Sequence, residues 1–544
     1  MNIILRKIKN TPVRLRIIHR ELSFVIDGFW KSLGEAYLIS RRLRNSKIQS
    51  KRINAVAVIN SARSYPVSDI ELYFAHLLFL NGLTVYVLYD DGVLEHWDSS
   101  QSNKFKYYSP FRAKWNIRIR HKIRKKLVGL AYKNRRIHYI NYSRIIDKVQ
   151  PDTTVDQSDR AYALSSTKRF FQTGIIDTNV KEHNLYYKKS LQNCAVSRTV
   201  AQFTLKYLKP DLYITSHGIY SVWGPAYRKM KEAEVPTVVW QVPGTTSRRI
   251  RLIDRQDQIL ASTTDWKVFD YNTIFSEQML QTGKALFEAR INHDAYDTQE
   301  YFSDRVDGED TVKKITVNHR GFTLAMFPNV VWDGDIPERN ILFENVIDWC
   351  EFTINTIKNS NNHLYIRFHP SEVTRLKGTV KMEDILRQRL PDIDTFSNIT
   401  LIFSDEQLDT YTFARSEIDL GLIFDGTLCL ELTYMGIPVI ACTNGNFTLD
   451  EVVFKPDNRK KYSEWLINPS VILKKFKKEK DKRFKKAIKY AFWLYNASLY
   501  EFIPLEKPYP AKLNYKDADR RGKISSDQSR ITERLLRPLT GSYT

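Results

Sequence analysis

Residues 54–92 read NAVAVINSARSYPVSDIELYFAHLLFLNGLTVYVLYDDG, and their pattern predicts the architecture of the chain. The apolar run 55–59 is typical of a buried strand, and the run 84–88 predicts a second one. Residues 69–81, between them, have the length and composition of a helix. A strand, a helix and a second strand in so short a span form a βαβ unit, which implies a parallel sheet.

The same alternation recurs along the chain. In the first half, strands are predicted at residues 211–215 and 237–240, with a helical segment between them. A second series follows a polar, mostly helical connection, and its predicted strands are residues 322–327, 364–368, 399–403, 420–424 and 438–441. We therefore predict the α/β class, with two facing Rossmann-like domains and ligands bound beyond the carboxyl ends of the strands.

Chain length and shifts in composition set the predicted boundaries. A chain of 544 residues exceeds what one core accommodates, so two domains with extensions are expected. The predicted parts are a basic helical N-terminal arm (1–53), a first Rossmann-like domain (54–265) with a basic insertion (100–150), a helical connection (266–318), a second Rossmann-like domain (319–473), a basic C-terminal helix with a return segment (474–515) and a polar tail (516–544).

Composition narrows the classes of function. The four cysteines are far apart in the sequence, which argues against a zinc ribbon or a disulfide scaffold and favours a reducing compartment. No apolar run approaches the ~20 residues of a membrane span, and residues 1–20 lack the apolar core of a signal peptide. We therefore expect a cytoplasmic protein. The net charge of +23 attracts polyanions, which include nucleic acid, anionic membranes and phosphorylated substrates.

The turn Asp425-Gly426-Thr427 joins the predicted strand 420–424 to a helix. Backbone amides at a helix N-terminus, together with the Thr427 hydroxyl, suit a phosphate, and Gly426 lets a ligand approach the backbone closely. Glu431 lies four residues after Thr427 on the same helix face, where its carboxylate can hold ribose hydroxyls. The alternative is a plain helix cap with Glu431 in solvent.

A second turn, Arg367-Phe368-His369-Pro370, ends the predicted strand 364–368, and the proline prevents the strand from continuing. Arg367 can grip a phosphate through two N–H donors, and His369 can donate to a leaving phosphate or neutralise its charge. A lone histidine is more often structural, but the adjacent arginine and the second phosphate-type turn favour a functional role.

The Arg-x-His-Pro turn and residues 424–440, which read FDGTLCLELTYMGIPVI, resemble the capsule-polysaccharide synthesis family of GT-B-type glycosyltransferases. Residues 327–333 and the helix that contains Asp348 resemble the start of that family's C-terminal domain. Ser216-His217-Gly218-Ile219-Tyr220 resembles its His-Gly-Ile-Tyr loop. The likeness covers residues 205–500 and, more weakly, 54–100. Sialyl- and Kdo-transferring relatives and alditol-phosphate polymerases share the His-Pro turn.

The resemblance implies roles for several residues. In transferases with the His-Pro turn, the histidine that His369 matches contacts the donor phosphate and assists its departure. The second domain is therefore expected to bind the donor through Arg367, His369, Asp425, Gly426, Thr427 and Glu431. The first domain is expected to bind the acceptor.

On the acceptor side, Asp90-Asp91-Gly92 matches a paired-acid motif that supplies the general base in some of these transferases. Two adjacent carboxylates that face a cleft can raise the pKa of one of them, which suits a base for an acceptor hydroxyl. The alternative is an ordinary Asp-Asp-Gly turn. His96 is an alternative base, and Ser216, His217 and Gly218 are expected to position the acceptor, with His217 as a further candidate base.

We therefore predict a glycosyltransferase that moves a sugar from a nucleotide-sugar donor to a capsule or surface polysaccharide or a lipid-linked acceptor. Hexosyl, sialyl and Kdo transfer all stay open. The nucleotide sugar is a co-substrate, and neither a cofactor nor a metal is required, because cationic side chains and helix amides can stabilise the leaving group. An alditol-phosphate transferase or a sugar-nucleotide epimerase on the same fold is the alternative. A non-enzymatic RNA-binding protein is disfavoured because the known nucleic-acid motifs are absent.

Two basic segments, 118–136 and 474–489, add a further expectation. The first is partly amphipathic, and such helices bind anionic membrane surfaces. We expect peripheral association with the inner face of the cytoplasmic membrane; a solvated helix face is the alternative.

Overall fold

The computed structural model describes residues 54–61, 67–96, 136–241, 249–254, 263–292, 312, 315–317, 319–332, 340–374, 380–501 and 524–540. The predicted basic arm and residues 118–135 of the first basic segment lie outside these residues.

The first domain is built on a sheet that has seven strands among the described residues, in the order β12-β6-β5-β4-β1-β2-β3. The strands are β1 (Val56–Ser61), β2 (Thr84–Tyr89), β3 (Ile137–Asn141), β4 (Leu212–Ser216), β5 (Thr237–Gln241), β6 (Arg249–Ile253) and β12 (Leu499–Glu501). β3, β2, β1, β4 and β5 are parallel, and β6 and β12 extend the sheet in antiparallel fashion. The predicted βαβ unit is confirmed, with α3 (Val67–Leu80) between β1 and β2.

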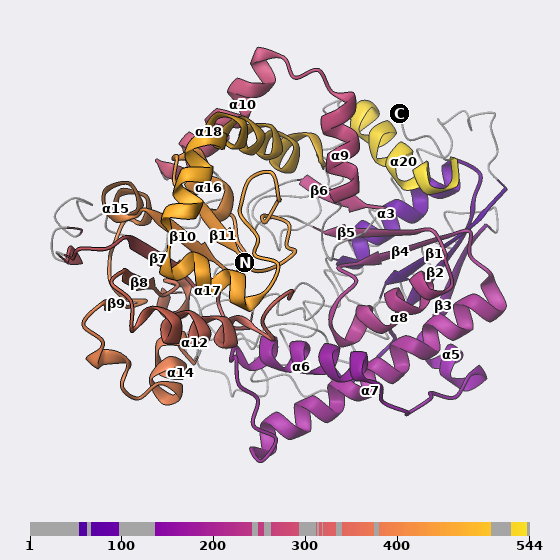
Figure 1. The fold of residues 1–544 in the computed structure, drawn as a ribbon. Coiled ribbons are helices and arrows are strands. Elements are labelled where there is room, and N and C mark those ends of the chain that lie inside the picture. Colours follow the sequence, from indigo (N-terminus) through magenta and orange to yellow (C-terminus); the bar gives the residue numbers. More distant parts are fainter. Residues whose placement is uncertain are drawn as a thin grey trace, which may run out of the picture.

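Helices cover both faces of this sheet (Figure 1). α3 and α20 (Ile524–Thr540) share one core with one face of the sheet. The other face packs against residues of α5 (Tyr142–Lys148), α7 (Lys181–Phe203) and α8 (Tyr220–Glu232). Because both faces are buried, the central strands are continuous apolar runs, which is why they could be recognised in the sequence.

The second domain holds a fully parallel sheet with the order β11-β10-β7-β8-β9 among the described residues. Its strands are β7 (Thr323–Phe327), β8 (His363–Arg367), β9 (Ile399–Ile402), β10 (Leu420–Ile423) and β11 (Val439–Ala441). One core lies beneath α12 (Val346–Ile357), α14 (Met382–Arg389) and α17 (Arg459–Ile467). The opposite core involves α10 (Glu277–Ile291), α15 (Thr410–Glu417), α16 (Leu428–Tyr434) and α18 (Ser470–Phe492). Two Rossmann-like domains are thus confirmed.

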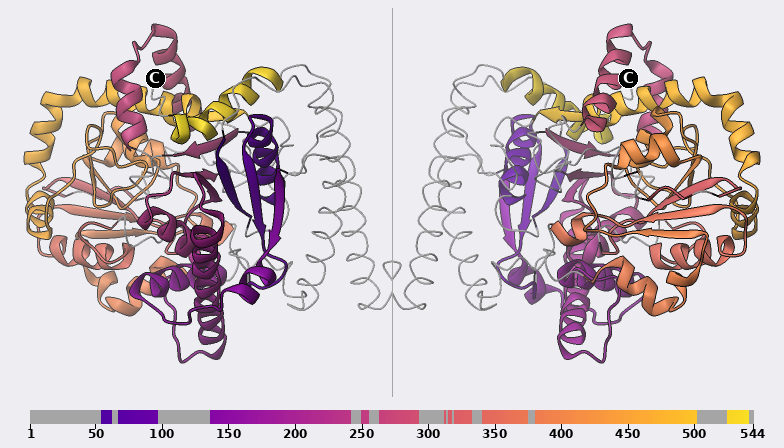
Figure 2. Two further views of the ribbon diagram at one scale, coloured as in Figure 1. Left: turned by 90° about the vertical axis from the view of Figure 1, so that its right-hand side faces the viewer. Right: turned by 90° about the vertical axis from the view of Figure 1, so that its left-hand side faces the viewer.

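The chain passes between the domains twice. α9 (Thr263–Asn272) and α10 lead into the second domain, and α18 with the π-helical turn η5 (Trp493–Ala497) leads back to β12. Figure 2 shows the second domain and the connecting helices from two further sides. Arg251 of β6 donates to the carbonyl of Leu494 at 2.6 Å, so a strand of the first domain holds the returning turn.

Two segments differ from the sequence-based boundaries. β3 lies inside the predicted insertion 100–150, but it is an edge strand whose residues are all half-buried, so it lacks a recognisable apolar run. Residues 524–540 of the predicted polar tail form α20. This helix buries Ile531, Leu535 and Leu536 against the first domain.

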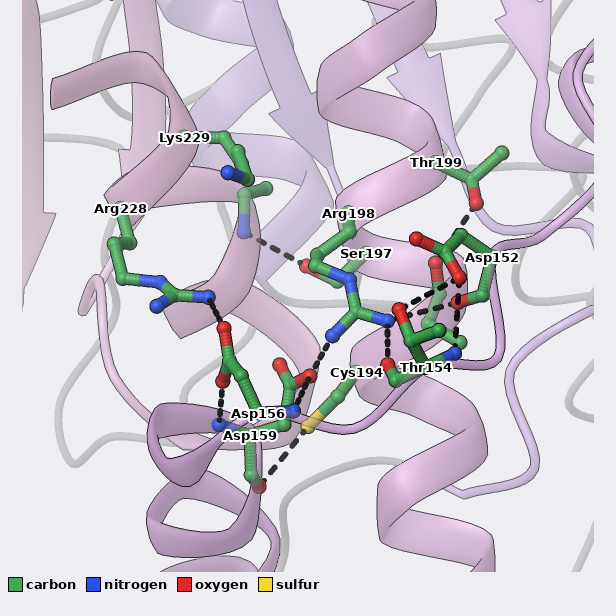
Figure 3. A network of polar contacts seen from close by, with 12 residues as sticks. Asp152, Thr154, Asp156, Asp159, Cys194, Ser197, Arg198, Thr199, Arg228 and Lys229 are labelled. Atoms are coloured by element: carbon green, nitrogen blue, oxygen red, sulfur yellow. Dashed lines mark hydrogen bonds and ion pairs between the residues drawn. The ribbon is translucent and has the colours of Figure 1, made fainter. Parts of the chain in front are cut away.

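A polar network fixes α6 (Gln157–Phe171) onto α7 and α8 (Figure 3). Arg198 of α7 is buried, pairs with Asp159, and donates to the carbonyl of Asp152 at 2.8 Å. Arg228 of α8 binds Asp156, the residue that caps α6. The opposite end of α6 is thereby held at the junction of the two domains.

Candidate functional site

The strand order of each sheet defines a point where the chain reverses direction across the sheet, and ligands of such sheets bind there. In the second sheet, the chain moves from β7 to β8 and β9 and then returns to β10 on the other side of β7. The switch point is therefore between β7 and β10. Asn329 follows β7 and Asp425 follows β10, and the Asp425 backbone N–H donates to Asn329 Oδ1 at 3.2 Å.

The first sheet has its switch point between β1 and β4, because β2 and β3 lie on one side of β1 and β4 and β5 on the other. Ser216-His217-Gly218 ends β4 at this point. Asp90 and Asp91 follow β2, one strand away. The structure thus brings the predicted acceptor-side residues to one edge of the first sheet.

The C-terminal end of α6 joins the switch-point edges of the two sheets. Arg169 donates to the hydroxyl of Tyr220, which follows the His217 loop, and its guanidinium lies 4.7 Å from the Tyr220 ring centroid. Five residues later, Gly174 packs so closely that an added Cβ would lie 2.7 Å from Val331 Cβ, just after β7. Residues 169–174 therefore touch the carboxyl edge of both sheets, as expected for facing domains.

Gly426 is required by its backbone. Its φ of +151° is one that side chains rarely permit, yet a Cβ built there meets no atom of the described residues within 4 Å. As far as those residues go, the space beside Gly426 is thus open to a ligand. Gly445 lies opposite, where an added Cβ would stand 2.3 Å from the Asp425 carboxylate oxygens, so this glycine makes room for the Asp425 side chain.

Glu431 is 3% exposed and binds two partners that the sequence analysis did not assign to the site. Its Oε1 accepts a hydrogen bond from Arg290 Nε at 2.8 Å, and its Oε2 accepts one from the Tyr411 hydroxyl at 2.9 Å. Arg290 Nη2 also donates to Thr427 Oγ1 at 3.3 Å. Glu431 is therefore not a solvated side chain, and its predicted contact with ribose stays a prediction.

Arg367 has a positioning role in the structure. It is 4% exposed, and its guanidinium donates to the carbonyls of Phe403 and Glu406 at 2.5 and 2.9 Å. Burial lowers the pKa of Arg367 to about 10. These bonds fix the loop after β9, because a buried guanidinium must satisfy its donors. A direct contact with a donor phosphate stays a prediction for this residue.

His369 is oriented by the residue two positions on. The Ser371 backbone N–H lies 3.2 Å from His369 Nδ1, and the Ser371 hydroxyl lies 2.7 Å from the same atom. Since a backbone N–H can only donate, Nδ1 is the acceptor, and a neutral His369 ring carries its proton on Nε2. An imidazole in this tautomer can donate from Nε2 to a phosphate oxygen.

A buried carboxyl group follows directly. Glu372 is 3% exposed and accepts from the Ser404 hydroxyl at 3.0 Å and from the Met382 backbone N–H at 3.3 Å. Burial raises the pKa of Glu372 to about 7, with a further upward contribution from the nearby carboxylate of Glu383.

The paired acids of the first domain are held in a hydrogen-bonded turn. Asp90 Oδ1 accepts from the backbone N–H groups of Gly92, Val93 and Leu94 at 2.7–3.1 Å. Asp91 accepts from Asn141 and from the backbone and hydroxyl of Ser143.

The expectation that one carboxyl group of this pair has a raised pKa is not met by Asp91 and stays a prediction for Asp90. Burial alone would raise the pKa of its carboxyl group, but the hydrogen bonds from Asn141 and Ser143 outweigh burial and lower it. His96 is likewise held, with Nε2 2.9 Å from the Ser190 hydroxyl and Nδ1 2.9 Å from the Tyr186 hydroxyl. A catalytic role for Asp90, Asp91 or His96 stays a prediction.

The loop after β4 is strained. His217, Gly218 and Tyr220 have φ of +56°, +68° and +66°, and two of these three residues carry side chains. Such clusters of left-handed residues persist where the surroundings enforce them, often at functional sites. His217 Nδ1 lies 2.5 Å from the Ser216 hydroxyl, and the ring stacks on Trp223 with centroids 5.2 Å apart.

The described residues bear on the predicted metal and membrane properties in two ways. No group of three or more His, Cys, Asp or Glu side chains is arranged to hold a metal ion in this part of the chain. Within the same residues, no helix combines the length and apolarity needed to cross a membrane.

No protein-family model and no curated protein matches the chain. Among solved structures, the β-Kdo 2,4 transferase KpsC of Thermosulfurimonas dismutans is 10% identical with a TM-score of 0.29, over 46% of this chain and 74% of that one. The UDP-GlcNAc 2-epimerase of Neisseria meningitidis is 10% identical with a TM-score of 0.27, over 82% and 99%. The calicheamicin glycosyltransferase CalG4 is 11% identical with a TM-score of 0.23, over 82% and 96%. Because these TM-scores are below 0.5, the likenesses carry no conclusion about function.

Proposed function

We propose that the protein is a glycosyltransferase that moves a sugar from a nucleotide-sugar donor to a surface-polysaccharide acceptor, either a capsule polymer or a lipid-linked precursor. The supporting observation is the placement of His369 and of Thr427 with Glu431 after the two strands that flank β7, at the carboxyl edge of the second sheet. An imidazole N–H, a hydroxyl and a carboxylate in that setting suit the phosphate and ribose of a nucleotide.

In the proposed reaction the acceptor hydroxyl oxygen attacks the anomeric carbon of the donor sugar. The bond from that carbon to the phosphate oxygen breaks, and the phosphate leaves with the electron pair. His369 stabilises the leaving oxygen by donating from Nε2. The proton of the attacking hydroxyl passes to a base. Of the candidate bases, His217 is favoured for this role, because it lies on the strained loop at the switch point whereas Asp91 has a lowered pKa.

Calorimetric titration with CMP, UDP, GDP and CDP tests the donor site. We expect at least one nucleotide to bind, and we expect His369→Ala and Glu431→Gln each to weaken that binding roughly tenfold, the value of one charge-assisted hydrogen bond. Matched controls are His183→Ala on α7 and Glu464→Gln on α17, which lie outside the site. The proposal fails if no nucleotide binds the wild type, or if neither site variant differs from its control. The alternative of alditol-phosphate transfer is tested separately, by analysis of the reaction product: a product that carries phosphate would identify that reaction.

The enzyme is further proposed to dock on an anionic membrane through α18. Seven lysines of this helix are exposed: Lys474, Lys475, Lys477, Lys478, Lys480, Lys482 and Lys485. Val471, in the first turn of α18, is 47% exposed, and Ile467, the last residue of the preceding helix α17, is 56% exposed. Lysines beside exposed apolar side chains suit a lipid surface, since the apolar groups gain nothing from a nucleic-acid backbone.

Vesicle flotation tests this docking. We expect binding to vesicles that contain phosphatidylglycerol, and little binding to vesicles of phosphatidylcholine or at high salt. Replacing Lys474, Lys478 and Lys482 with Gln is expected to weaken partitioning by about a hundredfold, at ~1 kcal/mol per lysine. The control replaces the exposed Lys181, Lys188 and Lys231 of the first domain. Equal binding by the two triple variants would contradict a role for α18.

A further inference from the structure

Arg290 is a cation that contacts the Gly426–Thr427 turn through Thr427. It lies at the end of α10, in the connection between the domains, and its side chain is 13% exposed. Its guanidinium reaches Thr427 through Nη2 at 3.3 Å and Glu431 through Nε at 2.8 Å. The phosphate-binding positive charge was expected from Arg367, but that guanidinium donates to two loop carbonyls.

The surroundings of Arg290 fix the direction of its donors. The Tyr411 hydroxyl donates to the second oxygen of Glu431 at 2.9 Å, so the carboxylate is held from two sides. The guanidinium carbon of Arg290 lies 5.2 Å from the ring centroid of Tyr495, in the turn that returns the chain to the first domain. A planar guanidinium clamped by a carboxylate and an aromatic ring is pre-organised, so it loses little entropy on binding an anion.

The polarity of the Thr427 bond points toward a ligand. Arg290 can only donate, so Thr427 Oγ1 is the acceptor, and the hydroxyl proton of Thr427 is left to donate elsewhere. Among the described residues, no acceptor takes a hydrogen bond from that proton. Thr427 is only partly buried and adjoins the open space beside Gly426, so a ligand oxygen can take this bond.

We propose that Arg290 is a positioning residue of the donor-phosphate site, which directs the Thr427 hydroxyl and supplies the positive charge beside it. This inference rests on the proposed nucleotide-sugar function. It goes beyond that function by assigning the phosphate-binding charge to the interdomain connection, so that donor binding engages the segment that links the two domains. A purely structural ion pair between α10 and α16 would hold the helices together without regard to phosphate.

The distinguishing experiment compares phosphorylated and phosphate-free ligands. Calorimetry is run with CMP and UDP, and with cytidine and uridine, on the wild type and on Arg290→Ala, Arg290→Lys and Thr427→Val. We expect Arg290→Ala to weaken nucleotide binding by about tenfold or more while nucleoside binding stays within about twofold, because only the phosphate contact is lost. Arg290→Lys keeps the charge and is expected to recover part of the loss.

A double-mutant cycle links the two residues. Because Arg290 acts on the phosphate partly through Thr427, the combined Arg290→Ala and Thr427→Val variant is expected to lose less than the product of the single losses. Arg483→Ala is the matched control: Arg483 is a buried arginine of neighbouring α18, bonded to Glu479 and to the carbonyls of Asp450 and Val453. It should lower stability but leave the ratio of nucleotide to nucleoside affinity unchanged.

The outcomes separate the two proposals. If the wild type binds neither CMP nor UDP nor the other nucleotides of the panel, the proposed function fails, and this inference fails with it. If the wild type binds a nucleotide, and Arg290→Ala and Arg290→Lys bind it as tightly, Arg290 has no phosphate role. Equal weakening for nucleotide and nucleoside would show a structural ion pair and overturn the inference. Should Arg290→Ala not fold, Arg290→Lys and Thr427→Val give the same comparison.

Discussion

Deletion of residues 524–544 is expected to abolish cooperative folding of the first domain. α20 buries Ile531, Leu535 and Leu536 in the same core as α3. Each such side chain stabilises by roughly 1.5–3 kcal/mol, and the total stability of a domain is only ~5–15 kcal/mol. The deletion would also leave Asp254, whose side chain is 1% exposed, without the arginines of α20 that pair with it.

Urea unfolding followed by tryptophan fluorescence measures this effect. A milder variant, Leu535→Ala, removes a side chain that is fully buried and is expected to cost about 2–5 kcal/mol. Glu533→Ala, on the exposed side of the same helix, is the control and should stay within about 0.5 kcal/mol of the wild type. A truncated protein with an unchanged unfolding transition would show that α20 is dispensable for the fold.

Replacing Glu372 with Gln is expected to make stability less sensitive to pH. The pKa of Glu372 is raised by burial from 4.5 in the unfolded chain to about 7 in the folded protein. The folded state therefore binds the proton more tightly, so this group contributes stability below pH ~4.5 that is lost as the pH rises through about 7. At ~1.4 kcal/mol per pKa unit, the loss is about 3 kcal/mol. A glutamine cannot ionise, so the variant does not lose this stability as the pH rises.

The measurement is the free energy of unfolding of wild type and Glu372→Gln at pH 5 and pH 8. The groups that face Glu372 are Glu383, Lys381 and the Ser404 hydroxyl, and they are retained in the variant. We expect the free energy of unfolding of the variant, relative to that of the wild type, to rise by up to ~3 kcal/mol from pH 5 to pH 8. Glu464→Gln, on the half-exposed side of α17, is the control. An equal difference at both pH values would mean that Glu372 does not titrate in this window.

Nine of the described strands could be placed from the sequence within one or two residues, and all nine pair with their neighbours in parallel within the two sheets, except where β5 meets β6. Most of their residues are buried, β9 being the exception, and each strand is a short apolar run that stands out against polar turns. The strands that were missed are β3, β6 and β12. β3 and β12 are edge strands, and β6 carries alternating arginines, so these segments lack that signal.

In the candidate site, too, some residues could be recognised from the sequence and others could not. Turns at strand ends were recognised because a switch in pattern from strand to helix marks them, and parallel strands bring such turns to one edge of a sheet. Arg290 was not recognised, since it is 137 residues from Thr427 and lies in a polar helix that carries no motif. Tyr411 and Tyr495 likewise have no local signal, because their roles depend on the partners that α15 and η5 bring to them.

The parallel strands of both sheets, and the order of the turns along their carboxyl edges, follow from the sequence alone, because hydrophobic period and turn residues are local properties. Which charged side chains contact those turns depends on the tertiary structure. In the fold, Arg367 donates hydrogen bonds to two backbone carbonyls, and Asp91 accepts hydrogen bonds from Asn141 and Ser143. Arg290 forms an ion pair with Glu431. The physical reason is that a buried charge must find partners, and in a two-domain fold those partners come from residues distant in the chain.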